Sequence, residues 1–227
     1  MAMQCSTLNK KQAHEIHGGL TQTTKMPCKS YSLPTIACVT GFKMRAIAGS
    51  ICSKCYAEKG NYKKYAGNIE PAQHARLESI SLAIAEPEYR ALWIQAMAVS
   101  IGDDEDFRFH DSGDLQNIEH LELYAELARA MPNCKFWLPT REYGIVSAFT
   151  AQYDIPDNLI IRLSAMFTDR PVIVPASLKG IAGVAVSNVH RKKAIGTACN
   201  APSTNGECRT CRKCWSRAVA AVSYSIH

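Results

Sequence analysis

The pattern of apolar and polar positions divides the chain into three parts. Residues 1–70 carry repeated Gly and Pro with few periodic apolar positions, which predicts an irregular region that contains cysteines. Residues 71–190 alternate helix-like and strand-like patterns, which predicts a β/α core. Residues 191–227 predict a Cys-rich appendage that ends in a short helix over 215–222. A length of 227 residues fits one structural domain built from these three parts.

Four helices are predicted in the core. Their expected ranges are 70–84, 86–99, 118–130 and 143–153. In each range the apolar residues recur at the spacing that places them on one helix face. Pro71 and Pro87 suit the first turns of the first two helices, because proline is tolerated there.

Five short apolar runs predict strands. Their expected ranges are 107–110, 134–138, 159–163, 172–174 and 183–186. Strands that alternate with helices imply a parallel sheet with right-handed crossovers. We therefore expect the α/β class, as a small or incomplete TIM-like β/α barrel or an open doubly wound sheet, with a Cys-rich metal-binding C-terminal appendage.

The composition indicates the kind of protein and the cellular compartment to expect. Hydrophobic residues make up 47% of the chain, which suits a globular core, and no apolar run is long enough to cross a membrane. Residues 1–11 are polar and lack the apolar stretch of a signal peptide. We expect a cytoplasmic protein with no membrane partner. Thiols stay reduced there, so paired cysteines favour metal over disulfides; secreted disulfide scaffolds, the alternative, are usually shorter.

The net charge of +6 is unevenly distributed along the chain. Residues 1–70 carry a net charge of +7, residues 71–190 of −7 and residues 191–227 of +6. Basic ends around an acidic middle suit a polyanionic partner, and we expect DNA. The alternative is a solvated basic surface that offsets the charge of thiolates bound to a metal.

The strongest metal signal lies near the C-terminus. Cysteines at C-x8-C-x2-C-x2-C spacing occupy positions Cys199, Cys208, Cys211 and Cys214. Four thiolates at this spacing satisfy a tetrahedral Zn site, which we favour, or a [4Fe–4S] cluster. The final residue, His227, could replace one Cys as a ligand. The alternative is a set of buried free thiols.

A second group of cysteines lies near the N-terminus. Cys52 and Cys55 form a C-x2-C pair, Cys38 is a third candidate ligand, and Cys28 is an uncertain fourth. Three cysteines with an open position would hold a cluster with a reactive iron, whereas four would make a structural site.

Polar residues follow the predicted strands. In parallel α/β folds the active site lies where the strands end, at their carboxyl edge. We expect catalysis by Asp111, Asp114, His110 and Arg141 and substrate contacts by Ser112, Gly113, Thr140, Ser164 and Asn188. The two carboxylates could divide the roles of nucleophile or base and of acid or orienter, and Arg141 could pair with a phosphate or carboxylate. The alternatives are helix capping and a surface ion pair.

Aromatic and basic residues are interleaved between the N-terminal cysteines and the core. They are Tyr56, Tyr62 and Tyr65 among Lys54, Lys59, Lys63 and Lys64. Such a segment can stack on bases and hold phosphates. It could equally pack beneath a loop.

Several motifs resemble the phage family called gene product 88. They are Lys25-Met26, Ser32-Leu33-Pro34, Cys38, Cys52-x-x-Cys55-Tyr56-Ala57, Lys59-Gly60-Asn61-Tyr62, the run 108–114, Thr140-Arg141, Pro156-Asp157-Asn158-Leu159, Ser164 and Tyr224-x-x-His227. The resemblance covers most of the chain and implies a bacteriophage protein in a bacterial host. It leaves the reaction open.

Three pieces are also similar to tRNA-guanine transglycosylases, in the same order. Residues 111–116 are similar to their Asp-Ser-Gly-Gly-aromatic-Gln motif, and residues 138–141 match their Leu-Pro-Thr-Arg element. Residues 208–218 resemble their zinc-binding stretch. This resemblance implies an enzyme that exchanges guanine in DNA for a 7-deazaguanine base. Lys135 stands where that family has its nucleophilic Asp, so Asp111 or Asp114 would have to take that role, on a base extruded from the stack.

Two other functions stay open. The Cys-x-x-Cys-Tyr-Ala element is similar to phage proteins related to radical SAM enzymes, which implies an iron–sulfur enzyme acting on nucleic acid or nucleotide. A non-catalytic, zinc-stabilised DNA-binding protein is the third possibility. RNA is the alternative to DNA as the substrate.

Overall fold

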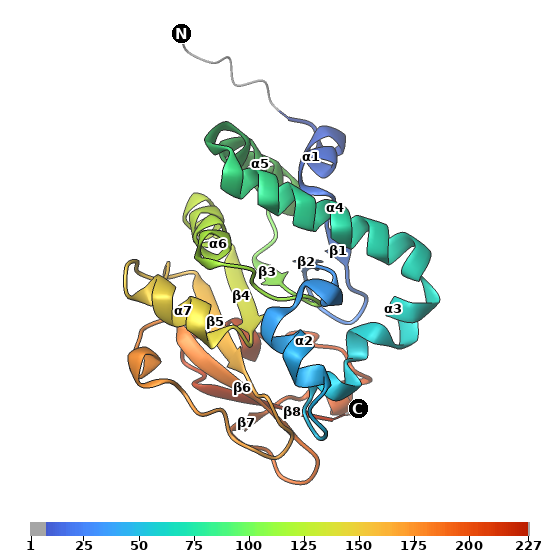
Figure 1. The fold of residues 1–227 in the computed structure, drawn as a ribbon, viewed down its shortest axis with the longest axis vertical. Helices are drawn as coiled ribbons and strands as arrows, with labels where there is room; N and C mark the ends of the chain where they lie inside the picture. The colour runs from blue at the N-terminus through green and yellow to red at the C-terminus, as the bar shows by residue number, and fades with distance from the viewer. Residues whose placement is uncertain (1–7, 227) are drawn as a thin grey trace.

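An eight-stranded sheet runs through the molecule (Figure 1). The computed structural model describes residues 8–226. The strands are β1 (Thr21–Gln22), β2 (Lys29–Tyr31), β3 (Asp106–Phe109), β4 (Lys135–Thr140), β5 (Leu159–Ser164), β6 (Val184–His190), β7 (Thr197–Ala198) and β8 (Ala221–Ser225). Their order in the sheet is β1-β2-β3-β4-β5-β6-β8-β7. Only β1 and β2 pair antiparallel, so the sheet is mostly parallel and the α/β class is confirmed.

The sheet is open. Pairing among the described residues begins at β1 and ends at β7, and these two end strands do not pair with each other. The described strands therefore form no barrel, and of the two expected architectures the open sheet is the one observed.

Seven α-helices connect and cover the strands in the described part of the chain. They are α1 (Lys10–His17), α2 (Val39–Arg45), α3 (Gly60–Lys64), α4 (Ala66–Ala85), α5 (Pro87–Ile101), α6 (Ile118–Ala130) and α7 (Tyr143–Thr150). Six short 3-10 helices accompany them: η1 (Thr35–Ala37), η2 (Cys52–Lys54), η3 (Tyr56–Glu58), η4 (Ala176–Leu178), η5 (Ala201–Thr204) and η6 (Lys213–Trp215). The four predicted helices are confirmed, although α4 begins before Pro71, which lies inside it.

Two predicted elements are wrong. Residues 172–174 form no strand, because they lie between two prolines and the Val172 amide donates to the Asn188 side chain instead of a neighbouring strand. The helix expected over 215–222 is replaced by η6 and β8, because residues 221–225 pair with β6. The N-terminal region is also more regular than predicted, since it contributes three helices and the strands β1 and β2.

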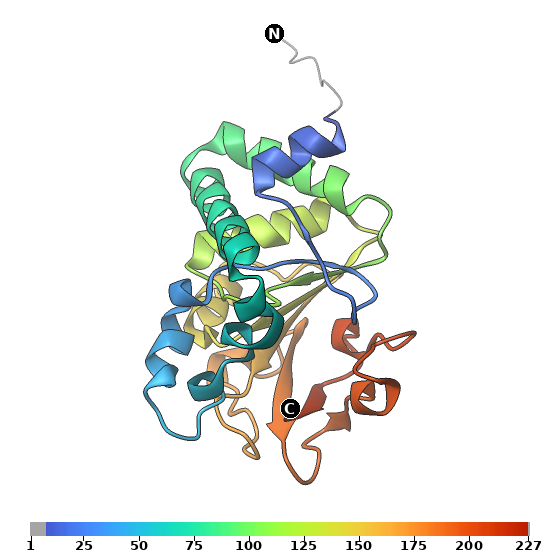
Figure 2. The same cartoon turned by 90° about the vertical axis from the view of Figure 1, so that its right-hand side faces the viewer.

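The two faces of the sheet have different covers (Figure 2). Alternate strand residues point to opposite faces. One face packs against the helices α4 to α7 through residues that include Phe107, Phe109, Phe136, Leu138, Ile161 and Leu163. The other face carries Trp137, Ile160, Ala185 and Val222, which pack with Cys28, Cys214 and Trp215. The Cys-rich C-terminal segment is thus the second cover of the sheet.

A buried arginine attaches that segment to the sheet. Arg162 in β5 is 0% exposed, and its guanidinium donates to four backbone carbonyls. Three of them belong to Lys213, Cys214 and Ser216, at 2.8–2.9 Å. Burial lowers the pKa of Arg162. Hydrogen bonds from a charged donor are stronger than neutral ones, so this side chain fixes the position of η6 and its cysteine.

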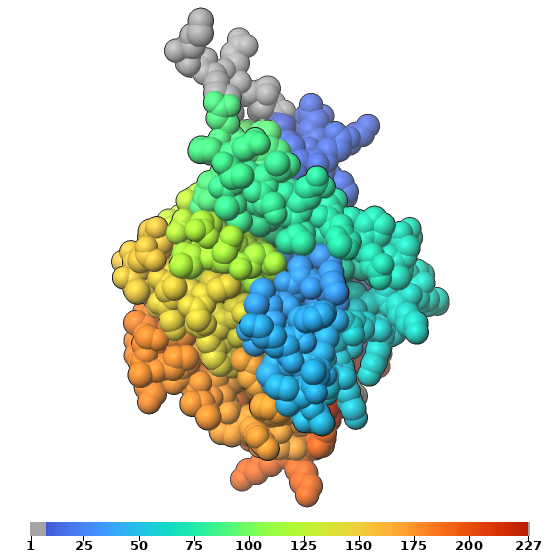
Figure 3. Space-filling view, viewed as in Figure 1, coloured from blue at the N-terminus to red at the C-terminus, as the bar shows by residue number. Residues whose placement is uncertain are grey.

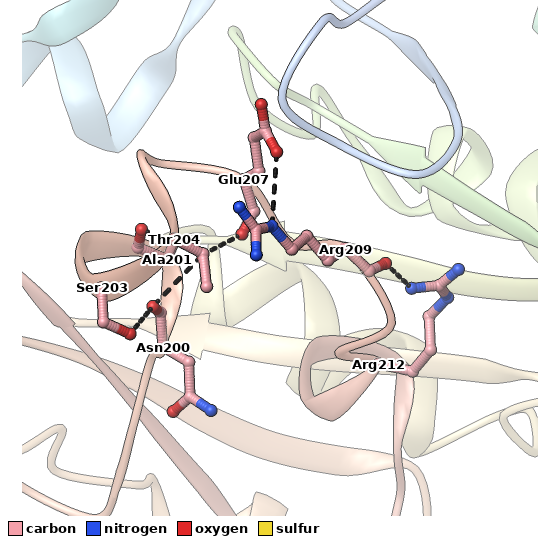
Figure 4. Close-up of polar contacts among 7 residues, drawn as sticks. All are labelled: Asn200, Ala201, Ser203, Thr204, Glu207, Arg209 and Arg212. Atoms are coloured by element: carbon pink, nitrogen blue, oxygen red, sulfur yellow. Dashed lines mark hydrogen bonds and ion pairs between the residues drawn. The ribbon is translucent and has the colours of Figure 1, made fainter.

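Local hydrogen bonds shape the loop of the appendage (Figure 4). Ser203 Oγ donates to the Asn200 carbonyl at 2.8 Å, and Thr204 Oγ1 donates to the Glu207 carbonyl at 2.5 Å. Arg212 Nη1 donates to the Arg209 carbonyl at 2.6 Å. These turns carry the loop from Cys199 to Cys214. Within residues 8–226, no helix has the length and apolarity needed to cross a membrane.

Candidate active site at the carboxyl edge of the sheet

The chain makes a tight turn directly after β3. His110 and Gly113 have positive φ angles of 53° and 81°. A Cβ on Gly113 would lie 2.4 Å from the Cβ of Leu33, so this position requires glycine for both its conformation and its space. The Leu33 amide donates to the Ser112 carbonyl at 2.9 Å. The turn is therefore clamped against the chain that follows β2.

Asp114 joins the ends of β3 and β4. Its Oδ1 accepts from Thr140 Oγ1 at 2.5 Å and from the Leu115 amide at 2.9 Å, and its Oδ2 accepts from the Arg141 amide at 2.9 Å. Burial raises the pKa of Asp114 to about 6, against the opposing effect of these donors. Both oxygens are thus occupied by the protein itself.

Asp111 is surrounded differently. Its Oδ2 accepts from the Tyr62 hydroxyl at 2.7 Å, and its backbone carbonyl accepts from the Tyr56 hydroxyl. Its Oδ1 is buried and has no hydrogen-bond partner within the described residues. Its two carboxylate oxygens therefore differ, since only Oδ2 is engaged by a side chain from residues 8–226.

The hydroxyls next to Asp111 are held protonated. Burial raises the pKa of both Tyr56 and Tyr62, and the negative charge of Asp111 raises both further. They therefore act as donors. Burial alone would lower the pKa of nearby Arg108, but the tyrosines and Asp111 reverse that effect and raise it. The carboxylate consequently lies among two hydroxyls and a fixed cation.

His110 does not share this position. Its Nε2 lies 3.1 Å from the Tyr124 hydroxyl, and its ring centroid is 5.6 Å from that of His120. Burial lowers the pKa of His110 far below its usual range, and His120 and Arg108 lower it further. The structure therefore places His110 in the core as a neutral ring.

Arg141 and Glu142 follow β4 at the same edge. The guanidinium of Arg141 donates from Nε to the Ala165 carbonyl at 3.1 Å, and its side chain is only partly buried. Glu142 accepts from the Thr40 amide at 2.6 Å and from Thr40 Oγ1 at 2.7 Å. Its carboxylate thus satisfies an unpaired amide in the first turn of α2, which sets α2 over the edge of the sheet.

The expected substrate contacts are mostly engaged within the protein. Ser112 Oγ accepts from Gln73 Nε2 at 2.8 Å and donates to the Leu33 carbonyl at 2.9 Å. Ser164 Oγ accepts from Ser187 Oγ at 3.3 Å. Asn188 is used elsewhere, because it bonds the Val172 amide and the Ile195 carbonyl.

The N-terminal cysteines also lie at this edge. The Sγ atoms of Cys38 and Cys52 each lie 3.7 Å from the point where a Gly41 Cβ would stand. The Ile51 amide donates to the Met166 carbonyl, just beyond the end of β5. Burial and, to a smaller extent, the charge of Asp114 together raise the pKa of Cys38 to about 12. Cys55 is close enough to both thiols to affect their pKa values.

The C-terminal cysteines gather on the second face of the sheet. Cys199, Cys208 and Cys214 line a cavity of about 150 Å³ together with residues that include Met26, Arg108, Trp137 and Tyr224. The Cys211 amide donates to the Cys208 carbonyl at 2.9 Å, and Cys214 Sγ lies 3.1 Å from the Tyr224 hydroxyl. Cys28 packs in the same apolar cluster as Cys214 and Cys199, so it lies with this group.

In the described part of the chain, no three Cys, His, Asp or Glu side chains are arranged so that they could hold one metal ion. The expected ligand His227 lies outside the described residues. The cysteines are therefore brought together in two groups, but their side chains do not form a coordination sphere.

The comparisons with known proteins give one match. The model of the family described as gene product 88 matches residues 4–217, so the chain belongs to that family. No curated protein and no solved structure matches the chain.

Proposed function

We propose that this member of the gene product 88 family is a nucleic-acid-modifying enzyme that exchanges guanine in DNA for a 7-deazaguanine base. The observation that carries the proposal is the Asp111 carboxylate at the carboxyl edge of a mostly parallel sheet, where one of its oxygens accepts no hydrogen bond from residues 8–226. The choice of reaction comes from the sequence resemblance of residues 111–116 and 138–141 to the transglycosylase motifs alone.

The exchange would proceed in two displacements. Asp111 Oδ1 attacks C1′ of the target nucleotide, the C1′–N9 bond breaks, and guanine leaves with the bonding electrons and takes up one proton. The incoming 7-deazaguanine then loses its own ring N–H proton and attacks C1′, and the bond from C1′ to the carboxylate breaks. Protons balance and no oxidant is needed, as in other covalent catalysis by carboxylates.

Asp111 suits the nucleophile better than Asp114. The oxygens of Asp114 accept three hydrogen bonds from β4 and the turn, so an attack by either oxygen would break the link between the two strand ends. Asp111 Oδ1 makes no hydrogen bond within the described residues, but it is buried, so the attack requires the Tyr62 side chain that bonds the same carboxylate to move. We therefore assign Asp114 and Thr140 to positioning.

An exposed aromatic and basic surface adjoins Asp111. Tyr56 and Tyr65 are 59% and 48% exposed as residues, although the Tyr56 hydroxyl reaches inward to the Asp111 carbonyl. The exposed lysines around them are Lys54, Lys59, Lys63 and Lys64. Figure 3 shows the α2 and α3 segments, in blue and cyan, next to each other on one face. Stacking rings among cations suit a single-stranded or extruded nucleotide.

The direct test is base exchange by the full-length chain on guanine-containing DNA, with a labelled 7-deazaguanine base. We expect Asp111→Asn to abolish incorporation while the fold is kept. The matched control, Asp103→Asn, changes an exposed carboxylate before β3 and should keep full activity. An Asp111→Asn variant that exchanges bases at the unmodified rate would refute the mechanism.

We also propose a structural zinc ion for the C-terminal cysteines. Cys199, Cys208, Cys211 and Cys214 have the residue type and spacing that zinc requires, and basic residues near them offset thiolate charge. The thiols would have to turn toward one another to bind it, since they do not converge as they stand. Zinc would hold the appendage together and take no part in the exchange.

Elemental analysis of anaerobically purified protein tests this point. Stoichiometric zinc in colourless protein would agree with the proposal. Brown protein with iron, lost in Cys52→Ala, would instead support an iron–sulfur enzyme at the N-terminal cysteines, which lie at the carboxyl edge of the sheet.

A further inference from the structure

Exposed apolar residues gather in the segment that follows β2. They belong to η1, to α2 and to the turn after α2, and we call this set the α2 patch: Ile36, Val39, Phe42 and Ile47. Between 45% and 60% of each residue is exposed. Val39 and Phe42 are three positions apart, so they share one face of the helix. Exposed apolar residues that gather in this way indicate a binding surface.

The aromatic ring of the α2 patch has a fixed support. The guanidinium carbon of Arg45 lies 5.3 Å from the centroid of the Phe42 ring. Arg45 is itself held by an ion pair with Glu58 at 2.5 Å and by a hydrogen bond to the Thr35 carbonyl at 2.9 Å. A side chain that is already positioned loses less entropy on binding, so Phe42 suits a rigid contact with a ligand.

Several contacts connect the α2 patch to the surroundings of Asp111. Thr40 of α2 donates twice to Glu142, just past the end of β4. Glu58 lies in η3 together with Tyr56, whose hydroxyl donates to the Asp111 carbonyl. Figure 3 shows the segments of α2 and α3 next to each other on one face. The α2 patch therefore continues the aromatic and basic surface beside the carboxyl edge of the sheet.

The charge around the α2 patch favours a polyanion. Residues 35–65 contain a single carboxylate, Glu58, which pairs with Arg45. The cations of the same range are Lys43, Arg45, Lys54, Lys59, Lys63 and Lys64. Phosphates suit these cations but not the apolar residues. The largest apolar surfaces of DNA are the faces of its bases, which an intact duplex hides in the stack. An apolar patch within a basic surface therefore fits DNA whose base stack has been opened.

We propose that the α2 patch inserts Phe42 as a wedge between two base pairs of bound DNA. The inserted ring stacks on a base and keeps the step open. An enzyme that takes a nucleotide out of the stack leaves such a space, and the wedge stabilises it. The inference rests on the proposed function for its DNA ligand, whereas insertion is measured without any base exchange.

Fluorescence anisotropy with two labelled duplexes tests the insertion. The duplexes share one sequence, but one of them lacks a single base, so its stack already contains a gap. We expect the full-length chain to bind the duplex with the gap about tenfold more tightly, because insertion into an intact stack must first unstack two bases. Phe42→Ala should lose this preference. Tyr153→Ala, which changes an exposed aromatic residue beyond α7, is the matched control and should keep it.

The variant Phe42→Trp gives a second measurement. The natural tryptophans Trp93, Trp137 and Trp215 are buried, so an exposed indole on α2 adds a separate fluorescence signal. Stacking on a base should quench this signal when DNA binds. In Tyr153→Trp the added signal should stay unchanged.

Three results would overturn the proposal: equal affinity of the unmodified chain for the two duplexes, a preference for the gap that Phe42→Ala keeps, or unquenched fluorescence of Phe42→Trp on bound DNA. A dimer that dissociates in Phe42→Ala would overturn it as well, because the α2 patch would then join two copies of the chain.

The base-exchange assay separates this proposal from the proposed function. Exchange at the unmodified rate in Phe42→Ala, with no preference for the gap in the unmodified chain, refutes the wedge alone. A preference that depends on Phe42, without any base exchange, refutes only the reaction.

Discussion

Asp111 and Asp114 are three positions apart, yet their surroundings give them different roles. Three donors hold Asp114 between two strand ends, and Asp111 keeps a buried oxygen free beside the hydroxyls of Tyr56 and Tyr62. Both carboxylates were predicted from their position after a strand, but the sequence does not show which of them has which role. The contacts that distinguish the two residues come from segments far away in sequence, and the sequence around the turn gives no sign of them.

The raised pKa of Asp114 makes stability depend on pH. Burial raises this pKa from 3.8 to about 6, so the folded protein binds a proton that the unfolded chain releases within that window. The contribution of Asp114 to the free energy of unfolding is fully present below pH 3.8 and is lost as the pH rises through about 6. The loss is about 3 kcal/mol at most.

We expect Asp114→Asn to flatten this part of the stability profile. Urea unfolding of both proteins on either side of the window would measure it. This explanation of Asp114 is wrong if the unmodified protein becomes more stable between pH 3.8 and about 6 and the variant shows the same pH dependence.

The elements show what a one-dimensional pattern can reveal. Helix α6 matches its predicted range, because a continuous apolar face follows an Asn117 side chain that caps the first turn. Strands β2 and β8 were missed, since their partners β3 and β6 lie far away in sequence. The strand predicted over 172–174 is absent, because the flanking prolines and the Asn188 side chain hold this apolar run in a loop.

Arg162 is the clearest example of a residue whose structural role could not be predicted from the sequence. It lies inside the predicted strand 159–163, where nothing in the local pattern indicates that its side chain binds the carbonyls that position η6. We expect Arg162→Met to destabilise the protein by about 3–5 kcal/mol, because several buried carbonyls lose their donor.

Thermal unfolding of Arg162→Met beside Arg129→Met, whose arginine is exposed, would measure this loss. Equal melting temperatures in the two variants would show that the appendage is held by other contacts.

At the scale of the whole molecule, an open sheet separates a helical cover from a Cys-rich cover, and the candidate site lies where its strands end. The N-terminal segment, which the sequence shows to be basic, lies beside that edge. The exposed Lys63 and Lys64 stand on α3, whose Tyr62 bonds Asp111. Nucleic acid bound there would contact these cations next to Asp111, the proposed nucleophile.

Replacing Lys63 and Lys64 with Gln should therefore weaken DNA binding and make it less dependent on salt, by about two units in the slope of log K against log salt. Fluorescence anisotropy over a range of salt concentrations would measure both. Lys10→Gln combined with Lys11→Gln on exposed positions of α1 is the control pair and should leave the slope unchanged. A slope unchanged by the α3 variants would place the DNA elsewhere.

The most direct measurement is to look for the covalent intermediate. Full-length protein is incubated with guanine-containing DNA in the absence of any incoming base, denatured, and mapped by peptide mass spectrometry. The account predicts a DNA adduct on Asp111 that persists in Asp103→Asn and disappears in Asp111→Asn. An adduct on Asp114, or base exchange without any adduct, would contradict it.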